Sequence, residues 1–343
     1  MYIEKKMLKK YISYWLATMF WIVSIMIIVG GLTRLTDSGL SITEWELFSG
    51  FLPPLNETQW NIYFNLYKEI PEYKLQNYLM TLDEFKVIFW WEFIHRFLGR
   101  LIGIFFILPL IYFSMKLGFN KTKNLFIIFI LICFQGFIGW YMVTSGLVDR
   151  VDVSHYRLSF HLVLAFIILS LIFWNYLKYK GISHSEKKIN FNLTILFLLL
   201  IFLQISIGAF VSGMDAGKIY NSWPLMGSSY FPDDNSIGDL LNFEAFSDPS
   251  LVQFIHRNLA YLIFVFYLLI LFVVYKNNFQ SLYKATKIIG FILIVQIVLG
   301  ILTLLSSAQM IVSSMHQISS IFLVSSSVYL VYLNFNTNLQ LSD

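Results

Sequence analysis

The chain of 343 residues has few charged side chains and almost no cysteine. Asp, Glu, Lys and Arg make up 13% of it, against roughly a quarter in an ordinary soluble domain, while apolar residues reach 57%. This scarcity of charge excludes a soluble globule. The single cysteine, Cys133, excludes a disulfide within the chain, and because it lies in an apolar stretch we expect it to be a small buried hydrophobe.

Long apolar runs are abundant instead. A bilayer core about 30 Å thick needs roughly 20 helical residues per crossing. Eight runs are long enough, near residues 15–36, 87–113, 123–143, 157–177, 191–211, 250–275, 286–305 and 312–333. Stretches such as residues 193–203 are apolar on every face, which is typical of membrane helices and not of the alternating strands of a membrane barrel. The sequence therefore predicts an all-α, polytopic membrane protein.

Basic residues are unevenly distributed among the loops. Fourteen of the 24 Lys and Arg residues precede the first span or follow the second, fourth and sixth spans. They are Lys5, Lys6, Lys9, Lys10, Lys116, Lys121, Lys123, Lys178, Lys180, Lys187, Lys188, Lys276, Lys284 and Lys287, accompanied only by Glu4 and Glu186. Since basic loops stay on the cytoplasmic side, both termini are expected in the cytoplasm. The net charge of +4 then reflects topology, and no nucleic-acid partner is expected.

The chain also contains an internal repeat. Residues 92–96 (Glu-Phe-Ile-His-Arg) match residues 253–257 (Gln-Phe-Ile-His-Arg) at an offset of 161, and Asp37-Ser-Gly39 matches Asp215-Ala-Gly217 at an offset of 178. Other matched positions are Gly30 and Gly208, Trp45 and Trp223, Gln135 and Gln296, and Gly139 and Gly300. Each repeat holds four spans, an even number, so both halves enter the membrane in the same sense. We therefore expect two pseudo-symmetric parallel four-helix bundles, residues 1–180 and 181–343.

Two long outer loops, near residues 37–86 and 212–249, occupy equivalent places in the repeat. The first loop carries Trp60, Tyr63, Phe64 and Tyr67 at helical spacing, followed by a break at Pro71. This pattern predicts short amphipathic helices whose aromatic side chains pack over the bundle.

Four of the six histidines lie inside predicted spans. His95, His161, His256 and His316 each fall four to eight residues inside the outer end of an even-numbered span, roughly 6 to 12 Å below the surface. A single histidine there could simply hydrogen-bond a neighbouring helix, but ionisable residues in a membrane mark function by default. Two facing imidazoles can occupy both axial positions of a haem iron. We therefore expect two haem sites toward the outer leaflet, held by His95 with His161 and by His256 with His316.

The other two histidines, His155 and His184, fall in predicted loops and are expected to be solvated. Zinc fits the intramembrane histidines less well, because it commonly adds thiolates or carboxylates and only one carboxylate is close. A proton relay would need acids across the whole membrane, and the inner half has almost none. A quinone-linked electron carrier with two haems b and a transporter with parallel repeats remain the alternatives.

Arginines next to the predicted histidine ligands could donate hydrogen bonds to the propionate carboxylates of a haem. Arg96 and Arg257 directly follow a histidine, and Arg100 lies one turn beyond Arg96. Their alternative role is to pair with outer-loop acids or to anchor the helix end.

The two halves differ at one position of chemical interest. Glu92 lies three residues before His95, on the same helix face, and its counterpart is Gln253. Only the first half thus has a candidate acid or base, and we expect chemistry there and electron transfer in the second half. The alternative is that Glu92 only forms an ion pair with Arg96.

These residues closely resemble the haem A synthase family over nearly the whole chain. The resemblance rests on Glu92-x-x-His95-Arg96 with Gly99-Arg100, on Tyr156-Arg157-x-x-x-His161, on Phe254-Ile-His256-Arg257, on His316-Gln317, and on residues 37–45 leading to Pro53-Pro54. It implies that the C8 methyl group of haem O is oxidised to a formyl group, giving haem A for terminal oxidases, with water as the oxygen source. It also implies that His95 and His161 hold the substrate haem, that His256 and His316 hold a permanent haem b, and that Glu92 is the catalytic carboxylate.

The resemblance further implies a bacterial inner membrane location, with membrane lipid and haem O as binding partners. Haem O synthase and cytochrome oxidase assembly factors are the expected neighbours. Some bacterial members carry a cysteine pair in the first outer loop; this chain has none there and resembles the proteobacterial and mitochondrial subgroup. An electron route through such a thiol pair is therefore excluded, while the electron partner and a homo-oligomeric state are left open.

Overall fold

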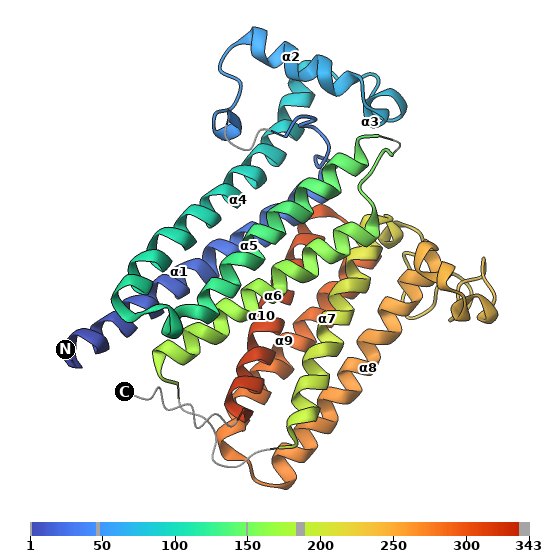
Figure 1. Cartoon of the computed structure of the whole chain (residues 1–343). Coiled ribbons are helices and arrows are strands. Elements are labelled where there is room, and N and C mark those ends of the chain that lie inside the picture. The colour runs from blue at the N-terminus through green and yellow to red at the C-terminus, as the bar shows by residue number, and fades with distance from the viewer. Residues whose placement is uncertain (1, 46–48, 149, 183–188, 336–343) are drawn as a thin grey trace. The chain divides into compact units, whose positions relative to one another are not determined.

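The computed structural model is helical almost throughout, and it describes residues 2–45, 49–148, 150–182 and 189–335. Within these ranges there is no β-strand, only an isolated bridge between Met226 and Ser229. Eight of the described helices are long and apolar enough to cross a membrane, which confirms the predicted spans. They are α1 (Tyr2–Leu35), α4 (Leu82–Leu117), α5 (Phe119–Gly146), α6 (His155–Lys180), α7 (Phe191–Gly213), α8 (Pro249–Lys276), α9 (Gln280–Leu305) and α10 (Met310–Asn334) (Figure 1).

Local sequence signals set the ends of these helices. The Thr81 side chain accepts a hydrogen bond from the backbone N–H of Glu84, whose carboxylate accepts one from the backbone N–H of Thr81, so a capping box starts α4. Asp248 caps α8 by accepting from the N–H of Leu251 at 2.9 Å. Gly118, with φ of 86°, separates α4 from α5 in a backbone conformation that favours glycine.

The chain forms two compact units. The first unit comprises residues 18–168 and 212–214, and the second comprises residues 1–17, 169–211 and 215–343. In the first unit α4 packs against α5; in the second unit α9 packs against both α8 and α10 (Figure 1). His95 and His161 belong to the first unit, and His256 and His316 belong to the second.

The first outer loop folds into the short helices that its pattern predicts. After the short helix η1 (Ser49–Phe51) come α2 (Glu57–Lys68) and α3 (Pro71–Leu75), and α2 packs on α4. The aromatic side chains do pack: the rings of Phe64 and Tyr67 lie 5.0 and 5.2 Å from the ring of Phe85 on α4. The second outer loop contains three short 3₁₀ helices, η2 (Ala216–Lys218), η3 (Ile237–Leu241) and η4 (Phe243–Ser247).

Two predictions about single residues are wrong. Cys133 is exposed on α5, because a span that is apolar all round does not reveal which of its faces packs inward. His155 is the first residue of α6 and partly buried, since its backbone and Cβ lie so close to Gly213 that a Cβ there would be 2.9 Å away. His184, Glu186, Lys187 and Lys188 lie outside the described residues.

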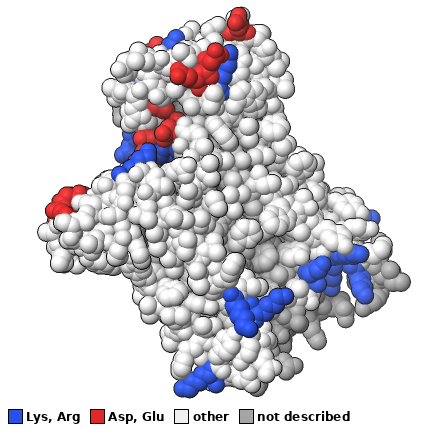
Figure 2. Space-filling model, turned by 180° about the vertical axis from the view of Figure 1, so that it is seen from behind, with Lys and Arg blue, Asp and Glu red and all other residues white. Residues whose placement is uncertain are grey.

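The outward-facing surfaces of the spans are apolar. Wide areas without any charged side chain separate the charged groups in Figure 2. Leu108 on α4 and Phe291 on α9, for example, are 62% and 70% exposed. Such faces suit contact with lipid. The direction in which the chain crosses the membrane stays a prediction.

Candidate functional site

The structure brings the first predicted histidine pair together. The ring centres of His95 on α4 and His161 on α6 are 6.5 Å apart, and the ring planes are nearly perpendicular at 80°. His161 follows the first residue of α6 by six positions, whereas His95 follows that of α4 by thirteen. The two helices differ because α4 begins further from its histidine, where Phe85 and Phe89 pack against aromatic residues of the first long loop.

The second pair lies in an equivalent setting. His256 on α8 and His316 on α10 are close enough to interact electrostatically. Glutamines from the neighbouring helices approach both rings: the Nε2 atoms of Gln204 and Gln296 lie 3.2 and 3.4 Å from the Nε2 atoms of His256 and His316. Gln204 also donates to the backbone carbonyl of His256 at 3.0 Å.

The first half has a related glutamine contact, in which the Gln135 Nε2 donates to the carbonyl of His161 at 2.9 Å. These glutamines are not among the site residues predicted from the sequence. The signal was present, however, because the internal repeat superposes Gln135 on Gln296.

Every one of the four imidazoles lies against a glycine of a neighbouring helix. A Cβ added at each glycine would come within 3.0 to 3.1 Å of a ring atom, which is closer than most real Cβ contacts, so the ring would have to shift slightly. The pairs are Gly30 with His95, Gly139 with His161, Gly208 with His256, and Gly300 with His316. These glycines are the ones that the repeat superposes, so both halves use the same close approach to fix their rings.

Glu92 is buried, with only 2% of it exposed, and both of its carboxylate oxygens are hydrogen-bonded. Oε2 accepts from the Ser41 hydroxyl at 2.7 Å and from the backbone N–H of Ile42 at 2.8 Å. Oε1 accepts from the Arg96 Nε at 3.0 Å and from its Nη2 at 2.6 Å. The ion pair with Arg96 is therefore present, and Glu92 also holds the start of the first outer loop.

The arginines next to the histidines bind the outer loops as well. Arg96 donates to the carbonyls of Ile42 at 2.7 Å and Glu44 at 3.0 Å. In the second half Arg257 donates to the carbonyls of Tyr220 and Ser222, both at 3.0 Å.

The carbonyls that the two arginines bind are equivalent positions in the repeat, because Ile42 and Glu44 correspond to Tyr220 and Ser222 at the offset of 178. This role could not be predicted from the sequence, since an arginine can reach many backbone carbonyls and only the tertiary structure selects among them. Arg100 differs from the other two arginines in that its guanidinium lies over the ring of Phe51, 5.4 Å from the ring centre.

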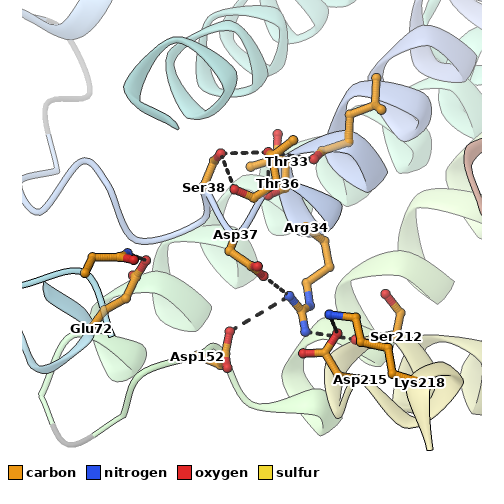
Figure 3. A network of polar contacts seen from close by, with 12 residues as sticks. Thr33, Arg34, Thr36, Asp37, Ser38, Glu72, Asp152, Ser212, Asp215 and Lys218 are labelled. Carbon is orange, nitrogen blue, oxygen red and sulfur yellow. Dashed lines mark hydrogen bonds and ion pairs between the residues drawn. The ribbon is translucent and has the colours of Figure 1, made fainter. Parts of the chain in front are cut away.

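A second polar network holds the outer end of α1 (Figure 3). Arg34 forms a 2.5 Å ion pair with Asp37, lies 3.9 Å from Asp152, and donates to the carbonyl of Ser212 at 2.9 Å. Its side chain is 11% exposed. The network fixes the point at which the segment of residues 37–45 leaves α1.

Several buried polar atoms near the histidines have no hydrogen-bond partner among the described residues. They are the Nδ1 atoms of His161, His256 and His316, the Oε1 atoms of Gln135 and Gln204, and the Nε of Arg257. Buried polar atoms of this kind are rare in native proteins and mark places where a bound group can complete the contacts. In the same described ranges no three His, Cys, Asp or Glu residues form a group that could hold a metal ion by themselves.

Fold and site together define a membrane protein with eight spans and two paired-histidine centres, each next to an outer loop that an arginine holds. Comparison with known proteins identifies the family: residues 13–328 match the family described as cytochrome oxidase assembly protein. The chain belongs to this family.

Curated relatives are similar over nearly their full length. The chain is 51% identical over 330 residues to "Heme A synthase" of Pelagibacter ubique (strain HTCC1062), covering 95% of this chain and 97% of that protein. It is 44% identical over 326 residues to the protein of the same name from Rickettsia bellii (strain RML369-C), covering 93% and 96%. It is 44% identical over 316 residues to that of Maricaulis maris (strain MCS10), covering 91% and 92%.

Proposed function

We infer that the chain acts as a haem A synthase, a multi-pass membrane oxidoreductase whose substrate is haem O. The relatives described above carry this name at up to 51% identity. The structural observation that carries the inference is the pair of His95 and His161, whose ring centres are 6.5 Å apart, in the half of the chain that also contains the buried Glu92.

The geometry of this pair fits a haem iron. Two imidazoles that both bound one metal ion, each at a metal–nitrogen distance of about 2 Å, would have ring centres up to about 6 Å apart. The observed 6.5 Å agrees with this separation. A pair of protein ligands suffices only where a macrocycle supplies the other ligands, so histidines in twos favour haem over zinc.

We assign the two sites as the sequence suggests. His95 and His161 hold the substrate haem O in the half formed by residues 1–180, and His256 and His316 hold haem b in residues 181–343. When bound, the haem groups supply the redox chemistry that side chains lack. The unpartnered Nε of Arg257 and the Arg100 guanidinium are the donors that we assign to haem propionates, since most N–H groups of Arg96 are already taken by Glu92 and the loop.

Glu92 is the residue that we assign to proton transfer. Conversion of a methyl group to a formyl group with water as the oxygen source releases four electrons and four protons. A buried carboxylate within the reacting half can accept such a proton. Gln253, at the equivalent place in the second half, cannot, which agrees with a second site that only passes electrons.

We further propose a bacterial inner membrane location with both termini in the cytoplasm and the haem sites toward the outer leaflet. Haem O synthase and cytochrome oxidase assembly factors would be the neighbours of such an enzyme. The runner-up function is an electron carrier with two haems b, which would be expected to have two equivalent halves. The replacement of Glu92 by Gln253 counts against it.

Haem analysis tests the proposal. The chain is expressed in a host that makes haem O but no haem A, and the extracted haems are separated by chromatography, with Glu92→Gln as the matched control that imitates the second half. We expect haem A from the wild-type chain and unmodified haem from the control. Protein that binds haem but yields no haem A would support the electron carrier, and colourless protein would support a transporter.

A further inference from the structure

If Glu92 accepts protons as the proposed function requires, its hydrogen bonds limit the route by which a proton can reach it. Four donors reach the two oxygens of this carboxylate: the Ser41 hydroxyl, the Ile42 N–H, and two N–H groups of Arg96. A carboxylate offers about four acceptor positions, so every one of them is occupied. A proton can therefore reach Glu92 only through one of its present partners or by displacing one.

Only one of these partners can pass a proton on. A backbone amide keeps its hydrogen, and a guanidinium stays protonated in proteins. A hydroxyl can release its own proton while it accepts another. Ser41 donates to Glu92 and more weakly to the carbonyl of Ile88, at 3.3 Å, and no donor to its oxygen is found among the described residues. Its lone pairs are thus available.

The second half of the chain provides an internal comparison. Arg257 holds the second outer loop through the same two carbonyls that Arg96 holds in the first. At the offset of 178 Ser41 becomes Ile219, and Glu92 becomes Gln253, whose Nε2 donates to the Ala216 carbonyl at 2.9 Å. The hydroxyl and the carboxylate are absent together where no chemistry is expected, and the loop is still held. Holding the loop therefore does not by itself require the pair of Ser41 and Glu92.

We propose that Ser41 is a proton relay that acts through Glu92. In one transfer the O–H bond of Ser41 breaks as its proton moves to the Glu92 Oε2, and Ser41 Oγ takes up a proton released by the water that adds to the substrate, so that Glu92 holds one of the released protons. Serine is regenerated, and the carboxylate becomes a carboxylic acid. Ser41 is 1% exposed, so bulk water does not compete for this route.

Three variants separate this role from a structural one. Ser41→Ala removes the hydroxyl, Ser41→Thr retains it, and Ser38→Ala is the matched control. Ser38 lies in the same segment and is 0% exposed, but among the described residues its hydroxyl bonds only to Thr36, to the carbonyl at 3.1 Å and to the hydroxyl at 2.7 Å. Each full-length protein is prepared in lipid nanodiscs, and haem O turnover, haem content and amide hydrogen exchange of residues 38–45 without haem are measured.

We expect Ser41→Ala to lower kcat for haem A formation at least about tenfold while KM for haem O and the haem content stay unchanged. Ser41→Thr should restore most of the turnover, and Ser38→Ala should stay within about twofold of wild type. Hydrogen exchange of residues 38–45 should be the same in Ser41→Ala as in wild type, because Arg96 and the Ile42 N–H still hold the segment.

Wild-type kcat in Ser41→Ala would overturn the proposal. Loss of turnover together with loss of haem or of loop protection would overturn it too, by showing a structural role. If Ser41→Ala cannot be recovered folded, Ser41→Cys decides, because a thiol keeps the volume but is a weak donor: reduced kcat supports the relay and wild-type kcat refutes it. Failure of the wild-type chain itself to form haem A would instead refute the proposed function.

Discussion

Glu72 provides the sharpest test of how the first outer loop is held. It lies in α3, is 3% exposed, and accepts a hydrogen bond from the Tyr67 hydroxyl at 3.0 Å. Burial, with a smaller contribution from the nearby carboxylates of Glu92, Asp152 and Asp37, raises the pKa of Glu72 from 4.5 to about 8, although the Tyr67 hydrogen bond opposes the change. The native hairpin of α2 and α3 therefore keeps this carboxyl protonated at neutral pH.

The sign of the pH effect follows from proton binding. Between pH 4.5 and 8 the folded hairpin holds a proton that the opened hairpin has lost, so stability falls as pH rises. Each pH unit in this window costs about 1.4 kcal/mol, which amounts to roughly 3 kcal/mol by pH 7 and roughly 5 kcal/mol above pH 8. The stabilisation is complete below pH 4.5 and lost as pH rises through 8.

Glu72→Gln should remove this dependence, because an amide imitates the protonated carboxyl and can still accept from Tyr67. The assay is hydrogen exchange of residues 57–77 in nanodiscs from pH 5 to 9, corrected for intrinsic exchange rates. In wild type we expect protection to fall about tenfold per pH unit up to pH 8, and in Glu72→Gln to stay level. The control is Glu69→Gln, whose carboxylate is 78% exposed and which should keep the wild-type slope. Protection that does not change with pH in wild type, or an equal slope in Glu72→Gln, would refute the reasoning.

Three further predictions concern the haem sites. Glu92→Gln should retain bound haem but abolish the formyl product, which haem extraction and chromatography will show; normal haem A formation would remove Glu92 from the mechanism. His256→Ala should lose the stably bound haem b, whereas His95→Ala should trap substrate or an intermediate, and equal pigment loss in both absorption spectra would argue against divided roles. Gly139→Ala should lower the haem content of the first site, because the new Cβ would lie 3.0 Å from the His161 ring. Gly136→Ala on the same helix, where nothing lies within 4 Å of the added Cβ, should leave the haem content unchanged.

Sequence patterns were sufficient to predict the features that depend on composition and on residue spacing along one helix. The eight spans follow from the length of the apolar runs, and the helix α2 follows from the spacing of Trp60 and its aromatic neighbours. Cys133 shows the limit of such patterns. A span that is apolar on every face has no contrast between a polar and an apolar face that would show which side packs inward, so the prediction that the cysteine is buried was wrong.

Candidate site residues could be named from the sequence, but their partners could not. The repeat pointed to His95 and its three counterparts because it brings the same residue type to matching places in four spans. It gave no indication that Glu92 would bond to Ser41, since the two are 51 positions apart and many side chains could reach a carboxylate. The hydrogen-bond donors around the buried Glu92 come from segments that are far apart in the sequence, so only the tertiary structure determines how many there are.

The sequence by itself therefore determined the membrane class, the eight helices, the twofold repeat and the residue types available for chemistry, because these depend on local hydrophobicity and on periodic spacing. Only the tertiary structure decided that the rings of His95 and His161 lie next to each other, that a glycine lies against each of the four imidazoles, and that the two arginines hold the outer loops. The physical reason is that hydrogen bonds and close packing act over a few ångströms between residues far apart in the chain, and no pattern along a single helix encodes those distances.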